Sequence, residues 1–484
     1  MLRESYTTWR CGAHEISLSR PRIMGILNVT PDSFSDGGQN LNAKAAVARG
    51  LAMLDEGADI IDVGGESTRP GHVAVSPQEE AERIVPVVRA LVEEGAIVSV
   101  DTRHADVARM CMRLGASIVN DVTGFTDSDM VKVAADTSCG CVIMHWDQDE
   151  GGLGTHVARR QVLLDDSRPN GSAVPHPVTS QRRFTLPEEA PIMRQVMGFL
   201  GDQARILLRA GVARERICLD PGPGFNKYAD EDVVIQRATH SMVSMGYPLL
   251  CAVSRKRFVG AVSGATDVTS RDAATAGICI SAIDQGARIV RVHNVAGVSQ
   301  AINAYWAVSH KDSRQGFVSL GSNVGNRVAN LARAVQLIDE IPLTCVVNAS
   351  HAYETEPAYG IATPVANAVA EIRTELHPLV LMDKLLEVED SLGRIRDDDR
   401  DPKEAGSGPR TIDCDLVWIE GESHVGAKLT LPHPRLGERD YVIVPMEDLM
   451  HDPERFLAHA GVRVAPREER VGHVTAELGE VVWE

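Results

Sequence analysis

Residues 43–70 read AKAAVARGLAMLDEGADIIDVGGESTRP, and this stretch contains one complete unit of the pattern that organises most of the chain. Ala43 to Glu56 carries apolar residues at helical spacing, and Gly57 follows as a C-terminal stop. The short apolar run Ile60 to Val63 has the composition of a buried strand. Glycines and polar residues follow directly, at 64–70. The stretch therefore predicts a helix, a strand and then a polar loop.

The same alternation of strand and helix extends on both sides of this stretch, from about residue 20 to 305. Such alternation is typical of a parallel sheet, and eight units of it close into a (β/α)₈ TIM barrel. The segment 151–187 is rich in glycine, proline and charge, and we expect it to be a mobile or disordered insertion after the fifth strand. The expected strands are Ile23 to Val29, Ile60 to Val63, Ile97 to Val100, Ser117 to Val119, Cys141 to Met144, Arg216 to Leu219, Pro248 to Val253 and Arg288 to Val292.

The residues after the barrel follow a different order. Ser309 to Gln315 form the expected linker, which gives a barrel domain over 1–308 and a second domain over 316–484. The order strand, helix, strand, strand, helix, strand predicts a ferredoxin-like α+β domain, in which two helices pack on one sheet. The expected elements are strand Phe317 to Gly321, helix Arg327 to Asp339, strand Thr344 to Glu354, strand Val365 to Thr374, helix Leu379 to Leu392 and strand Thr411 to Glu420.

The bulk composition excludes several classes of protein. The 484 residues carry a formal net charge of −18, which disfavours a nucleic-acid or anionic-lipid binding surface, because phosphate recognition depends on clustered Lys and Arg. No apolar run reaches the roughly 18 residues that span a bilayer, and Met1 to Arg22 is too polar for a secretory signal, so we expect a cytoplasmic protein. The nine cysteines favour reduced core thiols over disulfides, and the pair Cys139 and Cys141 lacks zinc-knuckle spacing.

Polar side chains follow each of the eight expected strands, where a barrel places its catalytic groups. One such residue alone is better explained as a helix cap or a turn former, but eight in the same place favour a binding site. Arg291 and His293 are two residues apart and project from the same side of their strand. Together with Arg69 they would suit a diphosphate.

Three other strand ends carry hydrogen-bond acceptors. The carboxylates of Asp101 and Asp220 and the amide of Asn120 suit a heterocycle that has ring N–H and amino donors. The sequence thus predicts a cationic region and an acidic region at the same end of the barrel.

Four stretches of the first domain closely resemble dihydropteroate synthase: 25–34 (GILNVTPDSF), 62–71 (DVGGESTRPG), 220–227 (DPGPGFNK) and 254–256 (SRK). The resemblance covers about residues 20–305. It implies that hydroxymethyldihydropterin diphosphate condenses with p-aminobenzoate, and that diphosphate leaves without the help of a nucleophilic side chain. It also implies Mg²⁺ and a homodimer formed through the barrel.

The same resemblance assigns roles to individual residues. A pterin-dependent methyltransferase barrel is the alternative, but it has no need for the diphosphate site. The implied pterin contacts are Asp101, Asn120, Met144, Asp220 and Lys256, with Phe225 as a further substrate contact. The implied diphosphate contacts are Arg69, Arg291 and His293, which together with Lys256 form the catalytic set. The p-aminobenzoate pocket would be shaped by Phe34, Thr68, Pro70 and Ser254, and Mg²⁺ would be bound with the help of Asn28.

The strongest feature of the second domain is 408–415, GPRTIDCD. Asp413 and Asp415 would point to one face of a strand, so both carboxylates can bind the same pair of hard cations. Aspartate is a poor strand former, and the alternative is an edge strand that charge protects from pairing. Arg410 offers a phosphate partner beside them. Further positive charge comes from Arg394, Arg396, His433 and Arg439.

Together with 318–326 (VSLGSNVGN) and 431–433 (LPH), this motif resembles hydroxymethyldihydropterin pyrophosphokinase over about residues 316–460. The implied reaction transfers the β,γ-diphosphate of ATP to the pterin hydroxymethyl oxygen and releases AMP. Asp413 and Asp415 would bind two Mg²⁺ ions that bridge the ATP phosphates. The implied nucleotide contacts are Arg394, Arg396, Arg410, His433 and Arg439, of which Arg410 is also catalytic, and the implied pterin-pocket residues are Asn367, Glu389 and Tyr441.

Two positions depart from the kinase pattern. Ser407 stands where the family usually carries a tryptophan, after an acidic segment at 397–401. Val365 stands where a second aromatic residue is expected opposite Tyr441. These departures leave a second interpretation open, in which the second domain is a degenerate scaffold for an active synthase. The tail after about residue 460 resembles no known pattern.

Overall fold

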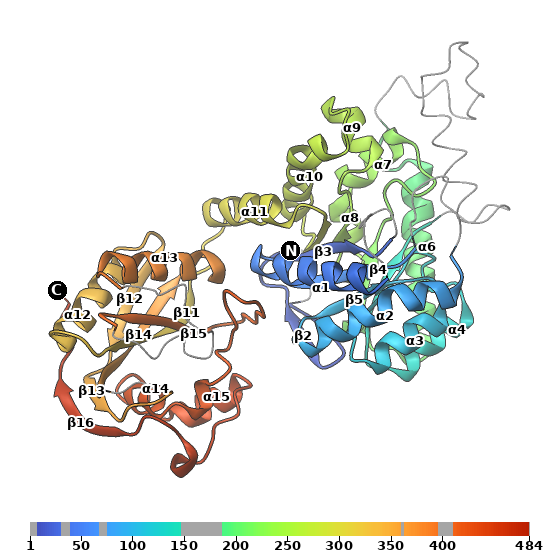
Figure 1. Cartoon of the computed structure of the whole chain (residues 1–484). Helices are drawn as coiled ribbons and strands as arrows, with labels where there is room; N and C mark the ends of the chain where they lie inside the picture. The colour runs from blue at the N-terminus through green and yellow to red at the C-terminus, as the bar shows by residue number, and fades with distance from the viewer. Residues whose placement is uncertain are drawn as a thin grey trace. The chain divides into compact units, whose positions relative to one another are not determined.

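The computed structural model describes residues 7–30, 39–66, 75–146, 186–359, 363–394 and 410–483. The chain divides into two compact units, Met1–Ile302 and Asn303–Glu484, which Figure 1 shows as a helix-covered barrel and a smaller sheet domain. Most of the predicted insertion at 151–187 lies outside the described residues. Among the helices that the structure describes, none combines the length and apolarity needed to cross a membrane.

The first unit contains eight parallel strands, as the sequence predicts. Their order is β8-β7-β6-β5-β4-β3-β10-β9, and a parallel bridge between Leu219 and Leu249 joins the two end strands into a barrel. Most residues of these strands are buried, because the barrel interior covers one side and the helices cover the other. The strands are β3 (Arg22–Asn28), β4 (Ile60–Gly64), β5 (Val98–Asp101), β6 (Ile118–Asp121), β7 (Gly140–Met144), β8 (Ile217–Asp220), β9 (Leu250–Cys251) and β10 (Ile289–Val292).

Helices surround the strands of this unit (Figure 1). Their buried faces form a continuous apolar layer against the barrel; α6, for example, contributes Met193, Val196, Leu200 and Leu207. The helices are α1 (Gln39–Asp55), α2 (Pro77–Glu93), α3 (Ala105–Arg113), α4 (Ser128–Asp136), α6 (Pro191–Arg209), α7 (Ala229–Arg237), α8 (Thr239–Val243), α9 (Arg257–Ser263), α10 (Asp272–Asp284) and α11 (Val295–Ser309).

A hairpin that the sequence reading did not anticipate precedes the barrel. Strands β1 (Thr8–Cys11) and β2 (His14–Ser17) pair with each other and pack Trp9 into a cluster with residues near the amino ends of the barrel strands, such as Ile60 and Ile118. The Trp9 indole N–H donates to the Arg216 carbonyl at 3.0 Å. All nine cysteines lie in described residues and are free, and all but Cys345 are buried, in line with the expected core thiols.

The second unit has an antiparallel sheet in the order β15-β11-β14-β13-β16, with β12 also pairing with β14. The predicted order of strands and helices over 316–420 is present. The elements are β11 (Arg314–Ser322), α12 (Arg327–Asp339), β12 (Thr344–Ala349), β13 (Ala352–Thr355), β14 (Val365–Thr374), α13 (Pro378–Ser391), β15 (Asp413–Ile419), α14 (Asp440–Met446), α15 (Pro453–His459) and β16 (Val474–Gly479).

The sheet is covered on both faces, whereas the sequence predicted helices on one. Val318 and Leu320 of β11 pack against α12 and α13, while Phe317 faces the opposite way. Because side chains alternate along a strand, this second apolar face also needs a cover. Helices α14 and α15 provide it. Residues 440–459 are therefore part of the core.

Two further differences concern the edges of the sheet. The single strand predicted over Thr344 to Glu354 is divided into β12 and β13, because the Ser350 hydroxyl accepts the Val369 N–H at 2.9 Å and interrupts regular pairing. The tail that resembled no pattern forms β16, which pairs with β13.

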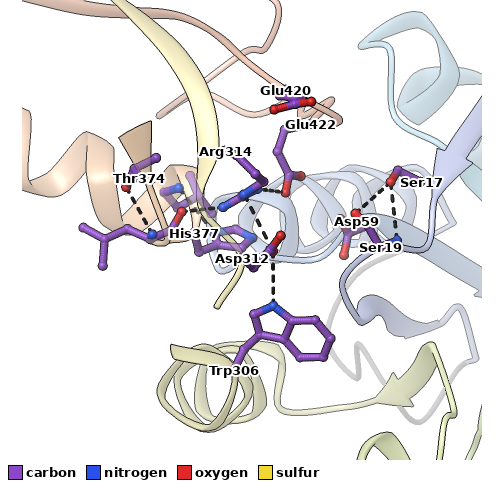
Figure 2. A network of polar contacts seen from close by, with 12 residues as sticks. Ser17, Ser19, Asp59, Trp306, Asp312, Arg314, Thr374, His377, Glu420 and Glu422 are labelled. Atoms are coloured by element: carbon purple, nitrogen blue, oxygen red, sulfur yellow. Dashed lines mark hydrogen bonds and ion pairs between the residues drawn. The ribbon is translucent and has the colours of Figure 1, made fainter. Parts of the chain in front are cut away.

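The second unit begins with an anchored segment. Arg314, inside the predicted linker, already belongs to β11, forms a buried ion pair with Glu422 and donates to the Leu376 carbonyl at 2.7 Å (Figure 2). The Trp306 indole donates to Asp312 at 3.2 Å just before it. The end of the expected linker is thus fixed to the sheet.

Candidate active sites

Four polar side chains meet at the carboxyl-end half of the barrel. Arg291 on β10 donates from Nε to Asp62 Oδ2 and from Nη2 to Asp101 Oδ2, both at 2.6 Å. Asn120 on β6 donates to the same Asp62 oxygen at 3.1 Å. The pairing compensates the cost of placing charges in a low-dielectric interior. The structure therefore brings together predicted residues from β5, β6 and β10.

Asp62 is the member of this group that sequence reasoning missed. It lies inside β4 and is fully buried, whereas the barrel site residues predicted from the sequence lie at or after the ends of strands. A usable signal was present, because an aspartate within the apolar run 60–63 is a poor strand residue and needs a partner when buried.

The surroundings of the acidic side chains in the barrel shift their pKa values. Burial raises the pKa of Asp101 to about 7, while the Arg291 guanidinium acts in the opposite direction. Burial also raises the pKa of Asp121, the next residue after Asn120, to about 6, against hydrogen bonds from Thr123 and Phe125. The pKa of Asp220 is also raised, because burial outweighs the opposing effect of the nearby Lys256 ammonium. The carboxyls of Asp101 and Asp121 can therefore change charge near neutral pH.

Lys256 lies beside the loop that leaves β8. Its ammonium donates to the Pro223 carbonyl at 2.6 Å and lies 4.8 Å from the centre of the Phe225 ring. Burial lowers the pKa of Lys256 to about 8, and the carboxylates of Asp220 and Asp232 oppose this shift. The lysine is thus held over the loop that begins at the predicted pterin residue Asp220.

A second lysine holds the same loop in shape. Lys227 is buried and donates to the carbonyls of Gly222 at 2.7 Å and Phe225 at 3.0 Å. Gly222 has φ +60°, and a Cβ there would lie 2.0 Å from the His145 carbonyl oxygen, so only glycine fits. Asp232 accepts the Gly224 N–H at 2.7 Å from the other side.

The remaining predicted residues of the barrel site fall into three groups. The Ser254 hydroxyl lies 2.9 Å from His293 Nδ1 and also accepts the His293 backbone N–H at 3.1 Å. Met144 packs at the end of β7 against Gly222, and Asn28 ends β3 opposite Gly64 of β4. The predicted residues Phe34, Thr68, Arg69 and Pro70 lie outside the described residues.

In the second unit three arginines converge on the acidic pair of β15. Asp413 forms ion pairs with both Arg394 and Arg410, and Asp415 accepts from Arg439 at 2.8 Å. Cys414 between them is fully buried, so the two aspartates share the opposite, more accessible side of the strand. This is the alternation that the sequence predicts.

Neighbouring polar groups fix these arginines and the strand. The buried Glu389 carboxylate accepts the Cys414 N–H at 2.6 Å and lies 3.4 Å from Arg394. The Asn323 side chain accepts the Arg410 N–H at 2.7 Å. Asn367, also buried, donates to the Thr355 hydroxyl at 2.7 Å. Glu389 therefore acts as a positioning residue for β15 in this structure.

Aromatic and cationic side chains form the next layer of this site. The Arg439 guanidinium lies 5.5 Å from the Tyr441 ring centre and 6.0 Å from that of Tyr359, and Arg435 lies 4.4 Å from Tyr359. Burial and the two arginines lower the pKa of His433 to about 3, so its imidazole is neutral. Tyr359 was not predicted, because it lies in a loop without periodic signal. The predicted Arg396 lies outside the described residues.

The donor set of β15 is compatible with magnesium that is shared with a substrate. Within the described ranges, no cluster of three or more His, Cys, Asp or Glu residues has metal-binding geometry. Magnesium at phosphate-transfer sites is commonly bound by only one or two carboxylates, together with substrate phosphates. Asp413 and Asp415 supply that number.

Two family models match the chain. Residues 24–293 match the pterin binding enzyme family, and residues 317–451 match 7,8-dihydro-6-hydroxymethylpterin-pyrophosphokinase. The first model covers more than half of the chain.

Relatives of the first unit are dihydropteroate synthases. The protein is 40% identical over 280 residues to that of Staphylococcus haemolyticus, covering 57% of this chain and 91% of the relative. It is 36% identical over 304 residues to that of Neisseria meningitidis serogroup C, covering 62% and 97%. A solved structure, dihydropteroate synthase from Xanthomonas albilineans in complex with 7,8-dihydropteroate, is 31% identical with a TM-score of 0.52 and covers 63% of this chain and 100% of that one.

These relatives favour the synthase over the methyltransferase alternative for the barrel, and the second family model agrees with the acidic strand and its arginines. The chain belongs to the pterin binding enzyme family and is a bifunctional enzyme of folate biosynthesis, with a dihydropteroate synthase unit followed by a hydroxymethyldihydropterin pyrophosphokinase unit.

Proposed function

We propose that the polar side chains at the carboxyl ends of β5, β6, β8 and β10 bind the pterin diphosphate. The observation that carries this proposal is the position of Arg291, which joins the carboxylates of Asp62 and Asp101 on two other strands. In the proposed complex Asp101, Asn120 and Asp220 accept and donate hydrogen bonds at the edge of the ring. The remaining predicted pterin contacts are Lys256, Met144 and Phe225.

The proposed chemistry is electrostatic. Negative charge moves onto the diphosphate as its bond to the pterin methylene breaks, and the p-aminobenzoate amine captures the carbon. Arg69, Arg291 and His293 stabilise the departing charge, and the Ser254 hydroxyl orients His293. Magnesium bound with the help of Asn28 would supply further neutralisation.

The p-aminobenzoate pocket and the oligomeric state are proposed on sequence alone. Phe34, Thr68 and Pro70 would shape the pocket together with Ser254. A homodimer formed through the barrel also stays a prediction, which the mass of the full chain in solution would test.

In the second unit we propose that Asp413 and Asp415 would hold two Mg²⁺ ions, which would neutralise negative charge on the phosphates of ATP. Their charges are balanced by Arg394, Arg410 and Arg439 in this structure. Cations on the carboxylates would leave these arginines free to contact phosphate oxygens, which suits a reaction that depends on positioning and charge neutralisation. Bound magnesium would supply charge neutralisation on the transferred group.

Other side chains would complete the kinase site. Arg396 and His433 are the further proposed phosphate contacts, and the neutral imidazole of His433 can donate one hydrogen bond. Asn367, Glu389 and Tyr441 would line or organise the pterin pocket.

The kinase proposal is tested by the magnesium dependence of AMP formation. With ATP and hydroxymethyldihydropterin, AMP release is expected to stop when EDTA removes divalent cations and to return when excess Mg²⁺ is added, because without a cation the carboxylates of Asp413 and Asp415 repel the triphosphate. Omission of the pterin gives the background. If AMP stays at that background with Mg²⁺ present, the second unit is a scaffold, as the changes at Val365 and Ser407 would allow.

The protonation of Lys256 predicts the alkaline side of the synthase pH profile. Its pKa is lowered to about 8 by burial, so the ammonium loses its proton and its charge as the pH rises through that value. We expect kcat/KM for the pterin diphosphate to fall above about pH 8, since this parameter reports groups of the free enzyme. Lys256→Arg keeps the charge at high pH and should remove the fall. An unchanged alkaline limb in that variant would contradict the assignment.

A further inference from the structure

A pocket of about 900 Å³ lies beside α4 and α6 and the loops that follow β6 and β7. Its volume is within the range of small-molecule sites. Phe125, Trp146 and Phe199 give it an aromatic lining, and α6 contributes Gln195 and Gln203. None of these residues belongs to the synthase or kinase sites described above.

Three side chains that line this pocket carry buried polar atoms without partners. They are His145 Nδ1, Trp146 Nε1 and Gln203 Oε1, and none has a hydrogen-bond partner within the part of the chain that the structure describes. The His145 side chain itself is almost completely buried. Unpaired buried polar atoms are costly and uncommon in native proteins. Three around one pocket indicate groups that a ligand satisfies.

The chemistry of these groups defines the ligand. The Trp146 indole N–H needs an acceptor, and the Gln203 amide oxygen needs a donor. The imidazole of His145 is neutral, because burial and the nearby Lys227 charge lower its pKa to about 2. The aromatic lining favours a flat molecule, and the three unpaired groups are all neutral, so none of them offers a partner for a charged ligand.

His145 also links the pocket to the synthase site. Its backbone N–H donates to the Asp220 carbonyl at 2.9 Å, and its carbonyl accepts from Lys227 at 3.3 Å. Its ring packs edge-on against Phe199 of α6, with 5.2 Å between ring centres. The pocket and the loop that begins at Asp220 are therefore in contact through this one residue.

We propose that this pocket is a second ligand site of the synthase unit, which takes a neutral, planar heteroaromatic molecule that accepts from Trp146 and donates to Gln203. The site is distinct from the pterin site: its lining includes His145 and Trp146 but not the preceding residue Met144, which is a predicted pterin contact.

The test uses 2-quinolone, a flat neutral amide, titrated calorimetrically into the full chain with excess 6-hydroxymethylpterin occupying both pterin sites. Gln203→Met and Trp146→Phe should each weaken binding about tenfold, the effect of one lost hydrogen bond. Gln300→Met, the same substitution at an exposed position of α11 outside the pocket lining, is the control and should change affinity less than about twofold. The ligand-free Gln203→Met variant should melt at the same or a higher temperature, since an unpaired buried amide is removed.

Three binding results would overturn the proposal. They are displacement of 2-quinolone by 6-hydroxymethylpterin, equal binding by the Gln203→Met variant, and no saturable binding below about 1 mM. A lower melting temperature for ligand-free Gln203→Met would also overturn it, because it would show that the amide is paired within the protein.

Discussion

Replacing Arg291 with alanine is expected to lower the rate of dihydropteroate formation by about 10²-fold or more, while AMP release by the second unit stays unchanged. Arg291 joins Asp62 and Asp101, so its loss removes a cation from the proposed diphosphate site and leaves the buried Asp62 and the partly buried Asp101 without this ion-pair partner. The effect should appear in kcat, because the charge that Arg291 would stabilise develops only as the diphosphate leaves. Steady-state assays with the pterin diphosphate and p-aminobenzoate measure it.

Breaking a buried ion pair also lowers stability, by about 3–5 kcal/mol, so a control must separate folding from chemistry. Arg214→Ala is matched, since Arg214 donates to Tyr247 and Gly246 at the opposite, amino-terminal end of β8. It should lose stability but keep synthase activity. Arg291→Lys keeps the positive charge but loses the planar guanidinium that donates to both carboxylates, so intermediate activity is expected. Full synthase rate in Arg291→Ala would refute the assignment.

Replacing Asp413 with alanine should reduce AMP formation by about 10³-fold or more, because losing a metal ligand removes several kcal/mol of transition-state stabilisation. Asp413 is an ion-pair partner of both Arg394 and Arg410, so its loss also leaves two cations in the proposed site with one carboxylate fewer. Dihydropteroate formation from supplied pterin diphosphate should be unaffected. The ATP- and pterin-dependent release of AMP is the measurement.

Asp383→Ala provides the comparison for this variant. Asp383 lies on α13 and pairs with Lys428 at the surface, where an ion pair contributes little. It should keep full kinase activity. Asp413→Asn retains the volume of the side chain and should be nearly as inactive as alanine, since charge is what the cation requires. Equal AMP release by Asp413→Ala and the unsubstituted protein would show that β15 is not the metal site.

The sequence predicted the barrel well because each of its units repeats one pattern. Every expected strand overlaps an observed one, although the run Pro248 to Val253 forms only the short β9 (Leu250–Cys251). The prediction that Arg291 and His293 leave the same side of a strand depended only on alternation. In the structure Arg291 contacts Asp101 of β5, and His293 contacts Ser254 in the loop after β9. Periodicity and strand ends are local features, and a sequence displays them directly.

Features that depend on tertiary contact were missed. Nothing in the sequence reading indicated that the hairpin β1–β2 packs at the amino end of the barrel, or that β16 pairs with β13. Tyr359 joins the kinase site through its contact with Arg435, from a loop that has no periodicity. Asp62 acquires its meaning only when Arg291, more than two hundred residues away, reaches it.

The sequence also could not show which charged side chains pair with one another. We expected Arg291 to belong to a cationic rim, separate from an acidic floor. The structure instead pairs it with two carboxylates, because isolated buried charges of either sign would be unstable. The same holds for the arginines around Asp413 and Asp415. Acidic and basic side chains at one end of a fold are therefore better predicted as one paired cluster than as two separate surfaces.

The whole chain is tested most directly by supplying it with hydroxymethyldihydropterin, ATP, Mg²⁺ and p-aminobenzoate, and measuring AMP and dihydropteroate together. We expect both products, with dihydropteroate absent when ATP is omitted and restored when pterin diphosphate is added in its place. Dihydropteroate formed only from added pterin diphosphate, with no AMP in the complete mixture, would contradict two working sites in one polypeptide.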